Sequence, residues 1–272
     1  MKRVFLIMGA ALFAVLFLFS GVMIYRHYAE EKESKEAFES IAGLVNEETT
    51  GQTVPSESTG ATTEEPDTPT EPTPYDKYGE VYEQNNDFVG WICIEGTNIN
   101  YPVMQTPDNP DFYLKHSFDK SYSDYGVPYV QEECDLASSD NLIIYGHHMK
   151  NGSMFSDLCE YVSRDFYEQH KIIHFDTLSA FGEYEIVAVF KTVATANEGF
   201  KYYHFVDAED EAAFDAYIAK CKELSLYDTG ISAEYGDKLI TLSTCEYSRT
   251  NGRMVVVAKL IVPPAGEVVV SG

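Results

Sequence analysis

The hydrophobic pattern opens with an apolar run from Val4 to Tyr25 that contains no charged residue. As a helix this run would be about 33 Å long, which is enough to cross a bilayer core. It is longer than the core of a secretory signal and lacks a small-x-small cleavage site, so an uncleaved anchor is favoured over a cleaved signal. Lys2 and Arg3 place its start in the cytoplasm and the remaining chain outside the cell, although the basic residues that follow the run weaken the asymmetry.

A polar segment separates this run from the patterned remainder of the chain. No Lys or Arg occurs from Glu36 to Asp76, and residues 46–74 are rich in Thr, Glu and Pro. Such a segment has little to bury and is predicted to be a disordered, extended stalk. Residues 30–45 have a weak helical pattern, which fits a juxtamembrane helix or a frayed segment. We therefore divide the chain into a cytoplasmic start and transmembrane anchor (1–27), a juxtamembrane segment and acidic stalk (28–74) and an extracellular domain (75–272).

Short runs of β-branched and aromatic residues dominate the extracellular domain, with Gly, Asp, Asn and Pro between most of them. This spacing predicts a mainly β domain built as a closed or nearly closed barrel. The predicted strands are two in the hairpin 87–105 and one each in 126–131, 141–145, 171–175, 182–193, 237–243 and 253–262.

Three helical patterns interrupt the strands. One opens the domain near residues 75–85, and a short one covers Met154 to Tyr161. The longest covers Glu209 to Leu224, where apolar residues recur at intervals of three and four and so share one face. The residues of that face are Phe214, Tyr217, Ile218 and Cys221.

The composition excludes some classes of function. The chain has a formal net charge of -25, whereas binding to nucleic acid phosphates needs clustered Lys and Arg. No nucleic acid partner is expected. Five cysteines cannot all pair, so at least one is free or pairs between chains. Because none forms a CxxC pair, we expect no metal-thiolate site. No cofactor is expected either.

One cysteine has a distinct setting, because Cys245 ends the strand "TLSTC". A reactive thiol needs a base or cation beside it. His147 follows a strand and a glycine in "NLIIYGHHMK", and a hairpin between the last two strands would place Arg253 opposite Cys245. Each residue alone is more often structural: a packed thiol, a surface histidine or a surface charge. His148 would point to the opposite side of an extended backbone.

In "TLSTC", "IYGHH" and "GRMVVVAKL" the chain resembles the sortase family, the membrane-anchored cysteine transpeptidases of Gram-positive bacteria. The resemblance implies that Cys245 is the nucleophile, His147 the acid and base, and Arg253 the oxyanion or positioning residue. Arg249 is a second arginine, inside the loop between Cys245 and Arg253, but the "GR" before the strand favours Arg253. Class B is indicated by "YGHHMKNGSMF", "DNPDFYL" and an insertion between Val193 and Lys238.

The class B resemblance implies a closed eight-stranded sortase-type β-barrel, with an N-terminal helix and a helix-bearing insertion before the strand that ends at Cys245. It implies cleavage of an NPxTN-, NPxTG- or SPxTG-like sorting pentapeptide after Thr, through a thioester. The expected partners are secreted proteins that bear a sorting signal and a peptidoglycan precursor or cross-bridge amine. The groove residues it implies, each of which also has a purely structural interpretation, are Asn109, Leu114, Ser243 and Glu246.

Three alternatives stay open at this point. The protein could assemble pili with a lysine side chain as the acceptor, or it could be a cysteine peptidase that hydrolyses its substrate. It could also be a wall-binding module with an inert thiol.

Overall fold

The computed structural model describes residues 2–47, 73–195 and 198–261. Nearly all of the predicted stalk and the C-terminal tail from residue 262 lie outside the described residues. The chain divides into two compact units, residues 1–43 and 44–272, and each is described by itself.

The first unit is helical. Helix α1 (Lys2–Glu47) includes the whole apolar run from Val4 to Tyr25 and continues through residues 30–45, so the helical alternative holds for that segment. Apolar side chains along the run are exposed, such as Phe13 and Phe17 at 71% each. Among the described residues this helix is the one that is long and apolar enough to cross a membrane.

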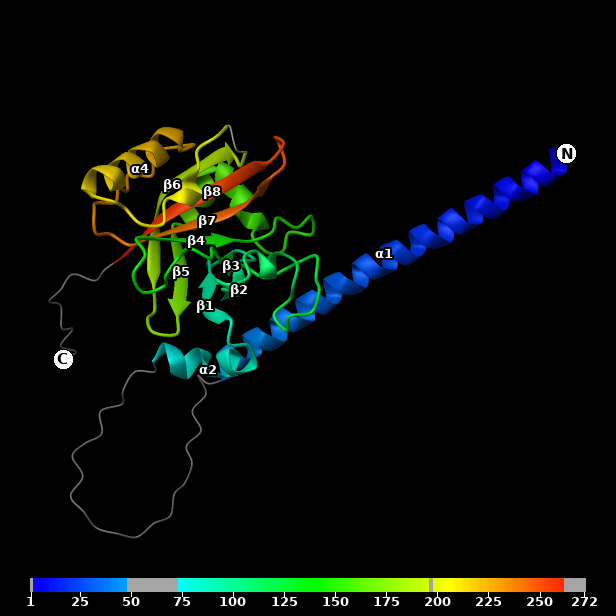
Figure 1. Ribbon diagram of the computed structural model, residues 1–272, viewed down its shortest axis with the longest axis horizontal. Coiled ribbons are helices and arrows are strands. Elements are labelled where there is room, and N and C mark those ends of the chain that lie inside the picture. Colours follow the sequence, from blue (N-terminus) through cyan, green and yellow to red (C-terminus); the bar gives the residue numbers. More distant parts are fainter. Residues whose placement is uncertain (1, 48–72, 196–197, 262–272) are drawn as a thin grey trace, which may run out of the picture. The chain divides into compact units, whose positions relative to one another are not determined.

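The second unit is built on a closed barrel of eight strands, as predicted (Figure 1). Around the barrel the order is β1-β2-β3-β4-β7-β8-β6-β5, and β5 pairs with β1 to close it. The pairs β2–β3 and β4–β7 are parallel, and the others are antiparallel. The strands are β1 (Phe88–Cys93), β2 (Asn100–Met104), β3 (Tyr129–Val130), β4 (Asn141–Tyr145), β5 (Ile172–Thr177), β6 (Glu183–Val193), β7 (Leu239–Glu246) and β8 (Gly252–Leu260).

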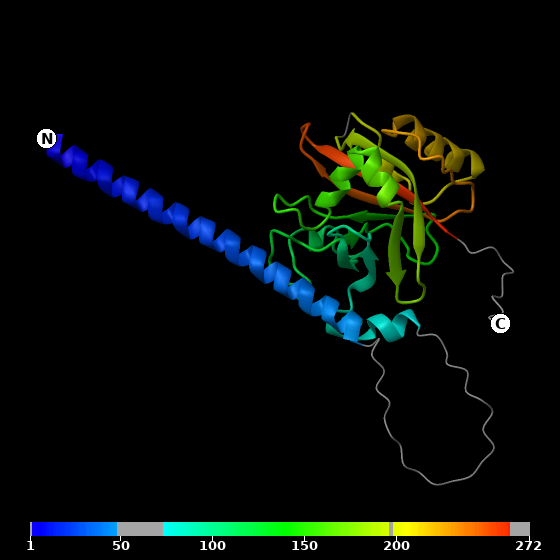
Figure 2. The same ribbon diagram turned by 180° about the vertical axis from the view of Figure 1, so that it is seen from behind.

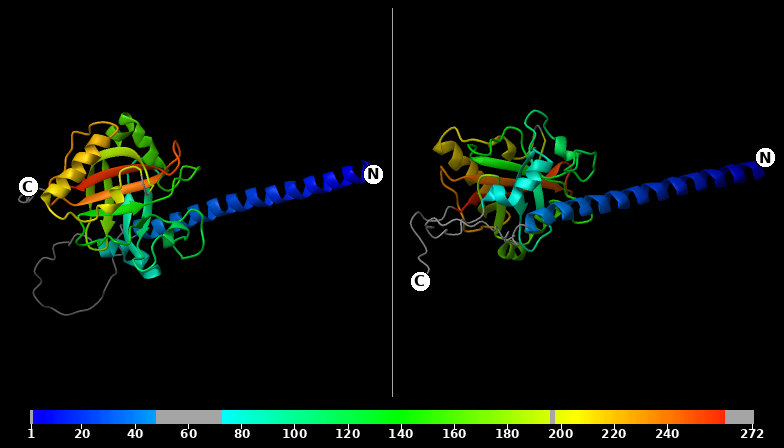
Figure 3. Two further views of the ribbon diagram at one scale, coloured as in Figure 1. Left: turned by 45° about the horizontal axis from the view of Figure 1, so that its top comes forward. Right: turned by 90° about the horizontal axis from the view of Figure 1, so that it is seen from below.

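Two α-helices confirm two of the three predicted helical patterns. Helix α2 (Pro74–Gln84) begins with a capping box, in which the side chains of Thr73 and Asp76 each accept a backbone N–H of the other. Helix α4 (Glu211–Leu224) is capped by Asp210, whose carboxylate accepts the N–H of Ala213 at 2.8 Å. All four residues of its predicted apolar face are buried. Helix α4 lies along the outside of the barrel beside β6, within the insertion between β6 and β7 (Figure 3).

The middle of strand β6 is buried on both faces of the sheet. Val187, Ala188, Val189 and Phe190 follow each other in β6 and are each at most 1% exposed. A run without alternation means that both sides of the sheet are covered. The inward side chains fill the barrel, while α4 and the 3₁₀ helix η2 (Ser156–Val162) cover its outside (Figure 2).

Three local predictions differ from the structure. The helix predicted from Met154 is the 3₁₀ helix η2, and a second short helix, α3 (Arg164–Gln169), follows it unpredicted. The strand predicted over residues 126–131 is reduced to the two residues of β3. The strand with Cys245 continues to Glu246, which pairs with Gly252.

The loop between β7 and β8 is consequently short, because Glu246 and Gly252 belong to the strands. Only residues 247–251 lie outside the two strands. Asn251 has a left-handed φ of 56°, which permits the tight reversal. A Cβ on Gly252 would lie 2.3 Å from the carbonyl oxygen of Glu246, so only glycine lets the strands come this close.

Candidate active site

Two strand ends bring the candidate residues to one rim of the barrel. Strands β4 and β7 run parallel, and the last pair of their ladder is Tyr145 with Ser243. His147 therefore lies two residues beyond the end of β4, next to the end of β7 that carries Cys245. On the other side of β7, Arg253 pairs directly with Cys245 in the antiparallel ladder, as predicted. The strand order thus places a thiol, an imidazole and a guanidinium on three neighbouring backbone segments.

Gly146 fixes the path of the backbone just after the end of β4. A Cβ at this position would lie 2.5 Å from Cγ of the buried Phe155 ring, so any other residue would displace that ring. The backbone of Gly146 also bonds to β7 through both its N–H and its carbonyl. Its N–H donates to the carbonyl of Ser243 at 3.1 Å, and its carbonyl accepts the hydroxyl of Thr244 at 2.8 Å. The turn that carries His147 is therefore fixed to the strand that carries Cys245.

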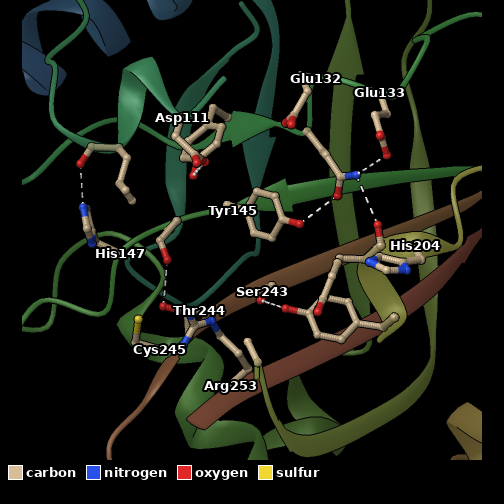
Figure 4. A pocket seen from close by; sticks show the side chains of 17 residues that line it. Asp111, Glu132, Glu133, Tyr145, His147, His204, Ser243, Thr244, Cys245 and Arg253 are labelled. Carbon is tan, nitrogen blue, oxygen red and sulfur yellow. Dashed lines mark hydrogen bonds between the residues drawn. The ribbon is translucent and has the colours of Figure 1, made fainter. Parts of the chain in front are cut away.

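A pocket of about 630 Å³ opens at this rim, and its lining includes His147, Cys245 and Arg253 (Figure 4). At one end of the pocket, the sulfur of Cys245 and the guanidinium of Arg253 lie beside each other (Figure 4). Arg249 does not belong to the lining and is exposed. The geometry therefore favours Arg253, of the two arginines, as the group beside the thiol.

His147 is oriented by a backbone carbonyl. Its Nε2 lies 2.7 Å from the carbonyl oxygen of Leu114, in the 3₁₀ helix η1 (Phe112–Leu114). Since a carbonyl can only accept, Nε2 carries the proton and donates it. In the neutral ring this leaves Nδ1 with a free lone pair for proton exchange. Burial lowers the pKa of His147, and it outweighs the hydrogen bond to Leu114, which acts in the opposite direction.

The side chain of Arg253 is held close to the start of β8. Its Nη1 donates to the carbonyl of Gly252 at 3.0 Å, and the residue is half-buried. A guanidinium has five N–H donors, so most of its donors stay available for a substrate oxygen. The positive charge also favours an anionic form of any group that comes near it, including an oxyanion.

The middle of the pocket contains aromatic side chains that the sequence did not single out. Tyr202, in the 3₁₀ helix η3 (Tyr202–His204), shares a 2.6 Å hydrogen bond with the hydroxyl of Ser243. Burial raises the pKa of Tyr202 to about 12, so its hydroxyl stays protonated at neutral pH. Tyr202 and Ala194 come from the insertion between β6 and β7, which therefore forms part of the pocket wall. The only hint in the sequence was the aromatic cluster "FKYYHF".

The far end of the pocket is acidic. Asp111, Glu132 and Glu133 contribute to its lining (Figure 4). Asp111 accepts the hydroxyl of Tyr129 at 2.6 Å, and Glu133 accepts a hydrogen bond from Nε2 of Gln131 at 3.2 Å. These carboxylates would attract a cationic group that enters the pocket.

The four residues predicted for the groove fall in different places. Leu114 is 37% exposed and lines the pocket, and Ser243 lines it with its hydroxyl bonded to Tyr202. Glu246 is not in the lining, and its carboxylate pairs with Lys191 at 3.0 Å. Asn109 is exposed in a turn where its backbone bonds to Thr106, and it is also outside the lining. A substrate contact of any of the four stays a prediction.

The remaining cysteines occupy structural positions. Cys134 and Cys221 are buried, and burial raises the pKa of both thiols, to about 11 and about 12. All five cysteines lie in the part of the chain that the structure describes, and each is a free thiol. Within these described ranges no group of three or more His, Cys, Asp and Glu side chains is arranged to hold a metal ion.

A closed barrel with a cysteine, a histidine and an arginine at one pocket is the arrangement of a cysteine-dependent acyl-transfer enzyme. Comparison with known proteins gives the family. The chain belongs to the sortase family, because the model of the sortase domain matches residues 92–261. The resemblance to class B is confirmed by the relatives described next.

Sortase B of Staphylococcus aureus is 36% identical to this chain over 182 residues, which are 65% of this chain and 71% of that protein. Among solved structures, the Staphylococcus aureus sortase B–substrate complex has a TM-score of 0.70 at 28% identity, and the match covers 86% of this chain and 98% of that one. A sortase B complexed with triglycine has a TM-score of 0.64 at 32% identity, with 70% of this chain and 88% of that chain covered.

Proposed function

We propose that this protein is a membrane-anchored transpeptidase that joins secreted proteins to a peptidoglycan amine. The observation that carries the proposal is the pocket that Cys245, His147 and Arg253 line together. The substrate would be a sorting pentapeptide of the NPxTN, NPxTG or SPxTG type, cut after Thr. The structure of a related sortase B with its substrate supports a peptide as the ligand of this pocket.

In the first step, the sulfur of Cys245 attacks the Thr carbonyl carbon. Nδ1 of His147 takes the thiol proton, because its other nitrogen is bound to the carbonyl of Leu114. Arg253 donates to the oxyanion that forms. When the intermediate collapses, the C–N bond breaks, and the proton on Nδ1 passes to the departing amine. The product is a thioester between Cys245 and the sorted protein.

In the second step, a primary amine attacks the thioester carbon. His147 accepts a proton from the amine and returns one to the sulfur, so the thiol is regenerated as the new amide bond forms. The acidic wall of Asp111, Glu132 and Glu133 supports transfer to an amine, because it would attract ammonium groups into the pocket that contains the thioester. The related sortase B complexed with triglycine, a peptide with a primary amine, also supports such an acceptor.

Location outside the cell and attachment to the membrane are part of the proposal. Helix α1 has the length and composition of a spanning helix, and Lys2 and Arg3 precede its apolar run. The anchor would hold the domain where exported proteins and lipid-linked wall precursors meet.

Mass spectrometry of the full chain after incubation with a library of sorting peptides tests the proposal. The expected result is an acyl mass on Cys245 that is lost in Cys245→Ala, followed by amide products when triglycine is added. Free acid as the sole product across many amines would identify a hydrolase instead. Efficient use of a protein lysine, and of no wall amine, would identify a pilus-assembling enzyme. A thiol that acquires no acyl group and resists alkylation would identify a binding module.

A further inference from the structure

The carbonyl oxygen of Cys245 lies just past the end of a strand ladder. In the parallel pair of β4 and β7, the N–H of Gly146 donates to the carbonyl of Ser243 at 3.1 Å. Carbonyls two residues apart in a strand point to the same side, so the carbonyl of Cys245 also faces β4. The paired residues of β4 end at Tyr145, however, so this side of β7 is left without a partner strand at Cys245.

The side chain of His148 supplies the hydrogen-bond donor that a partner strand would otherwise give to this carbonyl. Its Nδ1 lies 3.0 Å from the carbonyl oxygen of Cys245. Because that oxygen only accepts, Nδ1 of His148 must carry a proton. Nδ1 therefore has opposite roles in the two adjacent histidines. In His147 it is the free nitrogen, whereas in His148 it is the donor that holds the backbone of Cys245.

A thiol adds a second donor at the same point. Cys159, in η2, has its sulfur 3.3 Å from Nδ1 of His148 and 3.9 Å from the carbonyl oxygen of Cys245. Burial raises the pKa of Cys159 to about 11, so the thiol keeps its proton at neutral pH and can donate it. The cluster therefore joins η2 to the end of β7 behind the pocket.

Tyr247 fixes His148 from the other side. Its hydroxyl donates to the carbonyl of His148 at 3.0 Å, and the two ring centroids are 4.9 Å apart. The ring of His148 is thus held by the loop after β7 and by the backbone of Cys245 at once. It does not belong to the lining of the pocket.

We propose that His148 is a positioning residue for the transpeptidase reaction, which orients the sulfur of Cys245 by donating Nδ1–H to the carbonyl of the same residue. The proposal rests on the proposed function for its kinetic effect. A reacting atom that is displaced by about an ångström reacts far more slowly, so a loose end of β7 should reduce the rate of acylation more than the binding of peptide.

The test compares two substitutions of His148 in the full chain. His148→Phe keeps a flat ring against Tyr247 but has no donor, whereas His148→Asn keeps an N–H near the position of Nδ1. His174→Phe is the matched control, since His174 lies in β5 and outside the pocket lining. The readouts are kcat and KM for acylation of Cys245, and hydrogen exchange of a peptide that spans residues 243–248.

We expect H148F to lower kcat about tenfold with KM unchanged and to speed hydrogen exchange at the end of β7. H148N should stay within about threefold of the unaltered protein, and H174F should not differ from it. Unchanged kcat and exchange in H148F, or an H148N variant as slow as H148F, would overturn the proposal. If H148F does not fold, His148→Leu supplies the variant without a donor.

Failure of the proposed function would look different. In that case no sorting peptide acylates Cys245 in the unaltered chain, and the kinetic readout is lost for every variant alike. Hydrogen exchange at residues 243–248 still reports whether His148 holds the end of β7. Equal exchange in H148F and the unaltered chain would then refute the positioning role by itself.

Discussion

Replacement of Arg253 tests the geometry of the pocket most directly. This residue pairs with Cys245 across the β7–β8 ladder, and its guanidinium lies beside the sulfur (Figure 4). One of its donors, Nη1, is used for the carbonyl of Gly252. The substitution Arg253→Met keeps much of the length of the side chain and removes every donor and the charge.

The size of the effect follows from the role of the guanidinium. Loss of one donor to an oxyanion costs about 2.7–4 kcal/mol of transition-state stabilisation, which is about 10²- to 10³-fold in kcat. We expect R253M to lose this amount. Arg253→Lys restores the charge but not the planar fork, and one ammonium cannot serve both Gly252 and a substrate oxygen well. R253K should therefore fall between R253M and the unaltered protein.

The assay is the rate of thioester formation on Cys245 at saturating peptide, with melting temperature measured for each variant. Arg249→Met is the matched control, because Arg249 lies in the loop just before β8 but is exposed and outside the lining. Its rate should equal that of the unaltered chain. If R253M reacts at nearly the normal rate, or if R249M loses as much activity as R253M, the proposed role of Arg253 is wrong.

Three further predictions concern the rest of the pocket. Because burial lowers the pKa of His147, its ring should titrate below the ordinary value of about 6.5 in an NMR pH series, and titration at or above that value would contradict the buried geometry. Gly146→Ala should lower the melting temperature and reduce kcat at least tenfold, since the new methyl displaces Phe155; normal values of both would show that the turn tolerates a side chain. Glu132→Gln should raise KM for the acceptor amine about two- to threefold and leave acylation unchanged, whereas an equal KM would mean that the acidic wall does not attract the acceptor.

The parts of the molecule that depend on regular repeats could be predicted from the sequence. The apolar face of α4 follows from the spacing of Phe214, Tyr217 and Ile218, because a helix fixes which residues share a side. The pairing of Cys245 with Arg253 follows from the hairpin in the same way. Parallel strands ending at one rim also explain why a histidine about a hundred residues upstream belongs to the site.

The remaining features depend on irregular backbone segments. Their conformation does not follow from any periodic pattern of residues in the sequence. The bond between His147 and Leu114 requires the conformation of η1, and the bond between Tyr202 and Ser243 requires that of η3. Similarly, the link from His148 to the carbonyl of Cys245 exists because β4 ends where it does. These contacts connect loops to strands across long sequence distances, and a sequence pattern specifies neither their angles nor their partners.

The parallel pairing of β4 with β7 has a consequence for when the enzyme becomes reactive. The bond from Thr244 to Gly146 joins residues 98 positions apart, and the intervening chain includes two barrel strands and the whole insertion. Contacts of such sequence separation form late in folding, because the loop they close costs entropy before it returns any stabilisation. In a chain that is still folding, Cys245 therefore has neither His147 nor Arg253 in place beside it, and any reactivity that depends on the shared pocket arises only when the fold is complete.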